Sequence, residues 1–150
     1  MADRPDIRFT ADEQAAYLRI NRKAALATLD KDGFPHVTAM NFVLRDGAFY
    51  MTSYGKAQKV VNIRRNPKVA MMAETGSAYA ELKGVMVRGL CEIIDDPDAV
   101  RQVFAWSAEA RGDTYKRPTG ASDSAPKRVV LKIVPQKTIT WDHSKLGGRY

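Results

Sequence analysis

The sequence has a single cysteine, Cys91, and this scarcity excludes an intrachain disulfide. One thiol fits a protein kept in a reducing compartment, so we expect a cytoplasmic location. Because Cys91 lies inside a strand-like apolar run, it is predicted to be a buried structural thiol. Only two histidines accompany it, which is too few ligands for the usual zinc sets. The sequence therefore predicts no metal site.

Long apolar runs are missing as well. No stretch approaches the roughly 20 consecutive apolar residues that a membrane-spanning helix needs. The first residues contain no apolar segment of the kind that secretory signal peptides have. The common motifs of dinucleotide, nucleoside-triphosphate, zinc-protease and serine-hydrolase sites are also absent. We expect one soluble domain, residues 1–150, whose chemistry does not depend on any of those motifs.

Positive charge is in excess, since 24 lysines and arginines oppose 17 acidic residues and give a formal net charge of +7. Such a balance favours an anionic partner. The basic residues gather in 56–68 and in 127–149. Aromatic residues do not interleave with the first cluster, and no helix-turn-helix or RNA-binding motif occurs. An anionic small molecule is therefore expected, and nucleic acid is not.

Local patterns predict a mainly β protein with a few helices. Two Asp-Gly pairs, at 32–33 and 46–47, are typical of hairpin turns and predict antiparallel neighbours. The predicted helices span 11–20, 56–66 and 97–111. The predicted strands span 23–30, 35–45, 48–54, 68–75, 83–95 and 128–143, the last interrupted at Pro135. Six antiparallel strands with so few helices favour a barrel.

The segment 52–67, TSYGKAQKVVNIRRNP, carries the most informative local pattern. A strand ends in the hydroxyls of Thr52 and Ser53, a turn follows, and a helix with Val60 and Val61 inward then begins. Lys56 and Lys59 lie on one helical face. Hydroxyls, ammonium groups and the free N–H groups of a helix start could converge on a phosphate. A solvated basic helix with a serine cap explains the same residues equally well.

The strand 35–45 carries a second group of candidates. His36, Thr38 and Met40 share one side of it by strand alternation. Polar residues on so apolar a strand could serve a bound ring or a dimer contact, or could be satisfied polar groups at the barrel rim.

The C-terminal segment TITWDHSKLGGRY is the third candidate region. Trp141, His143, Lys145 and Tyr150 are costly to expose without a use, so this tail could dock across a partner subunit. A frayed tail is the alternative.

Three segments in order, AALATLDKDGFPHVTAMNFV, FYMTSYGKAQKVVNIRRNP and GVMVRGLCEII, resemble the pyridoxamine 5′-phosphate oxidase-like split β-barrel superfamily. The closing RVVLKIVPQKTITWDHSKLGG is most similar to its branch of flavin and deazaflavin oxidoreductases. The resemblance implies an antiparallel six-stranded split β-barrel that forms a homodimer, with two cofactor sites at the subunit interface. The implied cofactor is the deazaflavin coenzyme F-420, with FMN as the alternative.

The resemblance also implies roles for individual residues. Lys59 is the first candidate to hold the cofactor phosphate, the strand Pro35–Met40 is expected to run along the ring system, and the C-terminal candidates would come from the second subunit. The implied cofactor-binding residues are Pro35, His36, Thr38, Met40, Thr52, Ser53, Lys56, Lys59, Trp141 and Lys145.

The implied activity is hydride transfer from reduced F-420 to a small organic acceptor. Because the hydride chemistry belongs to the cofactor, no catalytic residue is expected to stand out. Positions 60 and 61 are Val-Val, so a second basic pair typical of FMN-dependent oxidases of the superfamily is not evident. An FMN-dependent enzyme of the same fold stays open as an alternative. So does a non-enzymatic cofactor- or haem-binding protein, for which His36 and His143 are the available imidazoles.

Overall fold

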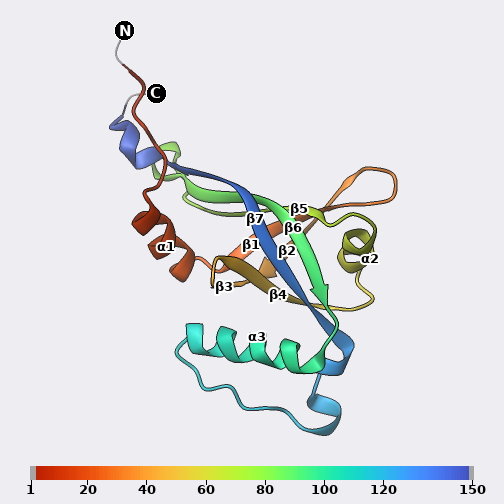
Figure 1. The fold of residues 1–150 in the computed structure, drawn as a ribbon. Coiled ribbons are helices and arrows are strands. Elements are labelled where there is room, and N and C mark those ends of the chain that lie inside the picture. Colours follow the sequence, from red (N-terminus) through yellow and green to blue (C-terminus); the bar gives the residue numbers. More distant parts are fainter. Residues whose placement is uncertain (1–2, 149–150) are drawn as a thin grey trace.

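One curled sheet of seven antiparallel strands forms the body of the computed structural model, which describes residues 3–148 (Figure 1). The described strands are β1 (Lys23–Leu29), β2 (Pro35–Asn41), β3 (Val43–Arg45), β4 (Ala48–Tyr54), β5 (Lys68–Thr75), β6 (Lys83–Ile94) and β7 (Arg128–Asp142). The α-helices among these residues are α1 (Ala11–Ile20), α2 (Gln58–Arg65) and α3 (Pro97–Ala110), and short 3-10 helices span Tyr79–Glu81, Gly120–Ser122, Ala125–Lys127 and His143–Leu146. The predicted mainly β, antiparallel class is confirmed, including hairpin turns at both Asp-Gly pairs.

The expected count of six strands becomes seven because the predicted strand 35–45 is broken at Phe42. The residues before it, in β2, pair with β1, whereas the residues after it, in β3, pair with β4. The strand order is β2-β1-β5-β6-β7-β4-β3, so β2 and β3 are the two edges of the sheet. Since only Phe42 separates them, the two edges must come together there, and the sheet curls into a half-barrel.

Two apolar clusters lie on opposite faces of this sheet. The main core fills the inside of the curl, where Leu26, Met51 and Leu131 are fully buried. The second cluster lies between the sheet and α3, where Val100 and Val103 meet Val130. The long loop after α3 returns along the helix to β7 (Figure 1). The outer face is therefore covered unequally, because α3 packs mainly against β7, β3 and β4.

Helix α2 lies near β1 and β6, and it begins at Gln58, two residues later than predicted. Val60 and Ile63, three apart, point inward and are buried. Val61 was expected to be inward, and that expectation is wrong, because the helical rotation leaves its side chain 47% exposed. The helix is held to β1 by a buried hydrogen bond from the Asn62 Nδ2 to the Thr28 Oγ1, at 3.0 Å.

Strand β7 is continuous, so the predicted interruption at Pro135 is wrong. The register with β6 shifts there instead: Arg88 lies opposite Lys137, and Gly89 lies opposite Pro135. Gln136 is thus the extra residue of a β-bulge. A Cβ at Gly89 would collide with the carbonyl oxygen of Val134, so this close approach of β6 and β7 requires glycine.

The buried thiol is confirmed, because Cys91 is 5% exposed on the inner face of β6. Burial raises the pKa of this thiol to about 12. Over residues 3–148, no helix has the length and apolar character that crossing a bilayer requires. In the same range, no cluster of histidine, cysteine and carboxylate side chains is suited to hold a metal ion.

Candidate anion-binding site

The start of α2 is built to leave backbone donors free. The Gly55 N–H donates to the Lys127 carbonyl at 3.0 Å, and the Ala57 N–H donates to the Tyr54 carbonyl at 3.1 Å, which fixes the turn between β4 and α2. The next two N–H groups, of Gln58 and Lys59, have no hydrogen-bond partner within residues 3–148. They point out of the helix start, where the dipole of the helix favours an anion.

Nothing in the first turn of α2 neutralises this positive end. The N-cap is Ala57, which provides no side-chain hydrogen bond, and the first turn contains no acidic residue. The alternative interpretation, a solvated basic helix with a serine cap, is therefore wrong about the cap. Lys56 is exposed and Lys59 is half-buried, and neither ammonium group has an ion-pair partner in the described part of the chain. Both remain available to an anionic ligand.

The two hydroxyls that precede the turn do not point the same way. Thr52 and Ser53 are neighbours on β4, so their side chains project from opposite faces of the sheet. Ser53 is 3% exposed, and its hydroxyl donates to the carbonyl of Tyr54 at 3.2 Å. Thr52 lies half-buried on the face that carries α3. The structure thus leaves Lys59 and the two free amides at the helix start and separates the hydroxyls. The expectation that Lys56 and Lys59 share a helical face is wrong, because α2 begins at Gln58 and Lys56 lies in the turn before it.

Strand β2 places its candidates as the alternation predicts. His36, Thr38 and Met40 are half-buried on the inner side, opposite residues of β1, whereas Pro35 is exposed at the start of the strand. The Thr38 Oγ1 is buried and has no hydrogen-bond partner among the described residues. A buried hydroxyl without a partner is costly.

The C-terminal candidates pack on their own chain. The Lys145 ammonium forms an ion pair with Glu13 at 2.8 Å and donates to the Arg8 carbonyl at 2.7 Å. The His143 Nδ1 lies 2.9 Å from the carbonyl oxygen of Tyr79. Trp141 lies opposite Gly84 on β6. Residues 141–146 are therefore ordered against neighbouring strands and the N-terminal segment, whereas Tyr150 lies outside the described residues.

Strand β7 also shows how far apart the candidates are within one chain. Its first residue, Arg128, pairs with Tyr54, directly before the turn that leads to α2. Trp141 lies near the other end of β7, roughly 40 Å along the strand at about 3.3 Å per residue. A single chain does not bring the α2 start and the C-terminal candidates around one small ligand.

Sequence reasoning missed the residue that fixes α2. Asn62 is completely buried, and besides its bond to Thr28 it accepts hydrogen bonds from the Gln58 Nε2 at 2.8 Å and the Arg65 Nη2 at 3.3 Å. Arg65 also donates to the carbonyl of Leu29 at 3.1 Å. An asparagine on the apolar side of an amphipathic helix was the available signal, since a buried amide needs partners.

Comparison with known proteins identifies relatives along nearly the whole chain. The family model described as pyridoxamine 5′-phosphate oxidase matches residues 10–142. An F420H(2)-dependent biliverdin reductase of Mycobacterium tuberculosis (strain CDC 1551 / Oshkosh) is 27% identical over 132 residues, which cover 86% of each chain.

Solved structures share the overall fold. A conserved hypothetical protein from Mycobacterium tuberculosis superposes with a TM-score of 0.83 at 34% identity, covering 100% of this chain and 95% of that one. An F420 reductase superposes with a TM-score of 0.65 at 28% identity, covering 83% and 94% of the two chains. As the resemblance predicted, the chain belongs to the pyridoxamine 5′-phosphate oxidase family.

Proposed function

We propose that this protein is a reductase that uses coenzyme F-420, with FMN as the alternative cofactor. The observation that carries the proposal is the start of α2, where two backbone N–H groups, Lys56 and Lys59 are all without partners in the described chain. The relatives named for F-420 support the choice of cofactor. The excess of positive charge agrees with a cofactor that carries several negative charges.

The residues at the α2 start fit the phosphate of either cofactor. Lys59 and the N–H groups of Gln58 and Lys59 would hold the phosphate, and Lys56 would add a second positive charge. The strand β2, from Pro35 to Met40, would run along the ring system. When bound, the reduced cofactor supplies a hydride donor. The chain's own contribution is to bind, orient and desolvate the reactants.

We also propose that the protein works as a homodimer. The outer face of β1, β2 and β5 is not covered by any described helix, and it exposes Val37 at 60% and Met72 at 38% beside the small side chains of Ala25 and Ala39. A contiguous apolar face of this kind is typical of an interface. A second copy seated on it offers a way for Trp141 and Lys145 to reach an α2 start, which one chain alone does not provide.

The test is a fluorescence titration of the ligand-stripped protein with F-420 and with FMN, side by side. Tight binding of F-420 alone would support the first choice, and tight binding of FMN alone would replace it with the alternative. Binding of neither would remove the enzyme proposal and leave the fold intact. Turnover is then measured as oxidation of reduced F-420, with biliverdin as the first acceptor because the curated relative is named for it.

Oligomeric state is measured separately, by sedimentation equilibrium. Val37→Lys places a charge on the outer face of β2 and should shift a dimer toward monomer. Gln102→Lys is the control, because it adds a charge at an exposed position of α3, away from the face of Val37. A wild-type monomer would contradict the homodimer proposal directly.

A further inference from the structure

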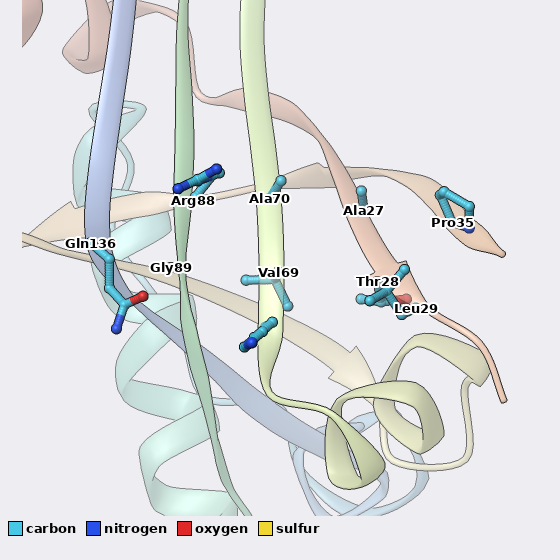
Figure 2. A pocket seen from close by; sticks show the side chains of 10 residues that line it. Ala27, Thr28, Leu29, Pro35, Val69, Ala70, Arg88, Gly89 and Gln136 are labelled. Carbon is cyan, nitrogen blue, oxygen red and sulfur yellow. The ribbon is translucent and has the colours of Figure 1, made fainter. Parts of the chain in front are cut away.

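A pocket of about 500 Å³ lies across β1, β5, β6 and β7, and Figure 2 shows Ala27, Ala70 and Arg88 on one side of the sheet there. Ala27 pairs with Val37, which the second copy would cover, so this pocket belongs to the proposed dimer interface. The loop that joins α3 to β7, residues 111–127, is attached elsewhere. It runs back along α3 and ends beside the turn that leads to α2 (Figure 1).

Arg101 of α3 ties this loop to the helix. Its Nη2 donates to the Asp123 carboxylate at 2.7 Å, and the two side chains are only 15% and 12% exposed. The other oxygen of that carboxylate accepts the Ala125 N–H at 3.1 Å, and Ala125 is completely buried between α3 and the sheet. Because a largely buried ion pair is little screened by solvent, it can hold this end of the loop in place.

The middle of the loop is held less firmly. Within the described chain, no hydrogen bond or ion pair joins residues 114–122 to α3. The Arg101 Nε and the hydroxyl of Tyr115, which belongs to the loop, are buried without a hydrogen-bond partner among residues 3–148. Buried polar groups without partners raise the free energy of the closed loop. The ion pair between Arg101 and Asp123 therefore has a large share in keeping the loop closed.

The loop ends against the turn before α2. The Lys127 carbonyl accepts the Gly55 N–H at 3.0 Å. The Arg128 guanidinium lies 4.1 Å from the centre of the Tyr54 ring, and its Nε donates to the Ser124 Oγ at 3.3 Å. A short continuous segment thus runs from the ion pair on α3 to the turn that presents the free N–H groups of α2.

We propose that Arg101 and Asp123 are positioning residues of the anion-binding site at the start of α2. Their ion pair keeps the loop closed, and the closed loop fixes the turn at Gly55. Neither residue touches the anion, which is the cofactor phosphate of the proposed function, on which this positioning role rests. Because coupling between two sites is reciprocal, a bound anion also favours the closed loop.

Asp123→Asn tests the connection, since asparagine keeps an oxygen that can accept from Ala125 and removes only the charge. Asp98→Asn is the matched control. Asp98 is the other carboxylate that pairs with Arg101, at 2.6 Å, but its side chain is 81% exposed and it belongs to α3, outside the loop. Thermal unfolding of each variant establishes that the fold is kept.

The first readout is hydrogen exchange of the Gly55 amide in the ligand-free protein, followed by NMR. Exchange should be at least about fivefold faster in Asp123→Asn, the lower end of coupling between two sites, and unchanged in Asp98→Asn. The reference is the Asn66 amide, which donates to the Asn62 carbonyl at the other end of α2 and should not change in either variant. A general loss of stability would raise exchange at both amides.

The second readout is affinity for whichever of F-420 and FMN the unaltered protein binds. Asp123→Asn should weaken it by at least about fivefold, and Asp98→Asn should not. Arg101→Gln should weaken it similarly, and the double variant with Asp123→Asn should lose little more, because both changes remove the same ion pair. Arg101→Lys keeps the charge and should retain most of the affinity.

Equal Gly55 exchange in Asp123→Asn and Asp98→Asn would overturn the positioning role, whether or not a cofactor binds. Faster exchange in Asp123→Asn with undiminished cofactor affinity would overturn it too, because the loop would then not act on the site. Binding of neither cofactor by the unaltered protein is a different failure. It would overturn the proposed function itself, and with it a role at that site, before any variant is compared.

Discussion

The indole of Trp141 occupies the space in which a side chain at Gly84 would begin. The two residues pair across β6 and β7, and a Cβ at Gly84 would overlap the six-membered part of the ring. An aromatic ring over a strand glycine compensates for the packing that the glycine lacks. This contact orients the first residue of the C-terminal segment, whose role in cofactor binding is proposed above.

We predict that Gly84→Ala destabilises the protein by about 1–3 kcal/mol, the usual cost of overpacking a well-packed site. The free energy of unfolding from urea titrations measures this loss. In a Trp141→Ala background the same substitution should cost much less, because the space is then open. Additive effects in this double-mutant cycle would show that the ring and the glycine are not coupled.

A second prediction concerns the buried bond between Asn62 and Thr28. Asn62→Ala removes the amide and leaves the Thr28 hydroxyl without its donor in a buried site. We expect a loss of about 1–3 kcal/mol in unfolding free energy. Val61→Ala, at the exposed neighbouring position, should change stability by less than about 0.5 kcal/mol. Equal small effects at both positions would mean that α2 docks through its apolar residues alone.

Much of this fold could be predicted because its local signals agree with its tertiary structure. Thr10 caps α1 by accepting from the Glu13 N–H, and Asp96 caps α3 ahead of Pro97, as their positions in the sequence indicate. The Asp46-Gly47 turn has positive φ angles at both residues, which suits that pair. These features depend on neighbours within a few residues, so they can be predicted from the sequence alone.

The errors arose where distant strands decide the structure. Nothing near Phe42 indicates a break, because the break follows from β2 and β3 joining opposite edges of the sheet. The bulge at Gln136 depends on the approach of Gly89 from another strand. The position of Arg88 opposite Lys137 likewise depends on pairing between β6 and β7. The error at Thr52 and Ser53 is of another kind, because both lie in the predicted strand and the alternation of neighbouring strand residues already directs their side chains to opposite faces.

A third prediction follows from the buried Cys91, whose pKa is raised from 9.0 to about 12 by burial. The thiolate is the reactive form, so the folded protein should react slowly with a disulfide reagent both at pH 7 and at pH 9. The unfolded chain should react rapidly in urea. Because the folded state holds the proton more tightly, this group's contribution to stability is complete below pH 9 and is lost as the pH rises toward 12. Rapid labelling of the native protein at pH 7 would contradict the burial.

The last prediction tests whether the C-terminal segment of one chain completes the site of its partner. Lys59→Ala should weaken cofactor binding by about ten- to a hundredfold, the loss of a hydrogen bond to a charged group. Truncation after Thr140 removes Trp141 and Lys145, and it should weaken binding as well.

The two defects can then be combined in one dimer. Lys59→Ala chains and truncated chains are co-expressed, and the mixed dimer is purified through two different tags. In this dimer the truncated subunit keeps Lys59, and the Lys59→Ala subunit keeps the C-terminal segment. If the segment acts on the partner, this mixed dimer has one complete site and should bind one cofactor per dimer with the affinity of the unaltered protein. If the segment acts only on its own chain, both sites are defective and tight binding is lost. Arg128, which pairs with Tyr54 just before the turn to α2, lies roughly 40 Å along β7 from Trp141. This separation within one chain favours the first outcome.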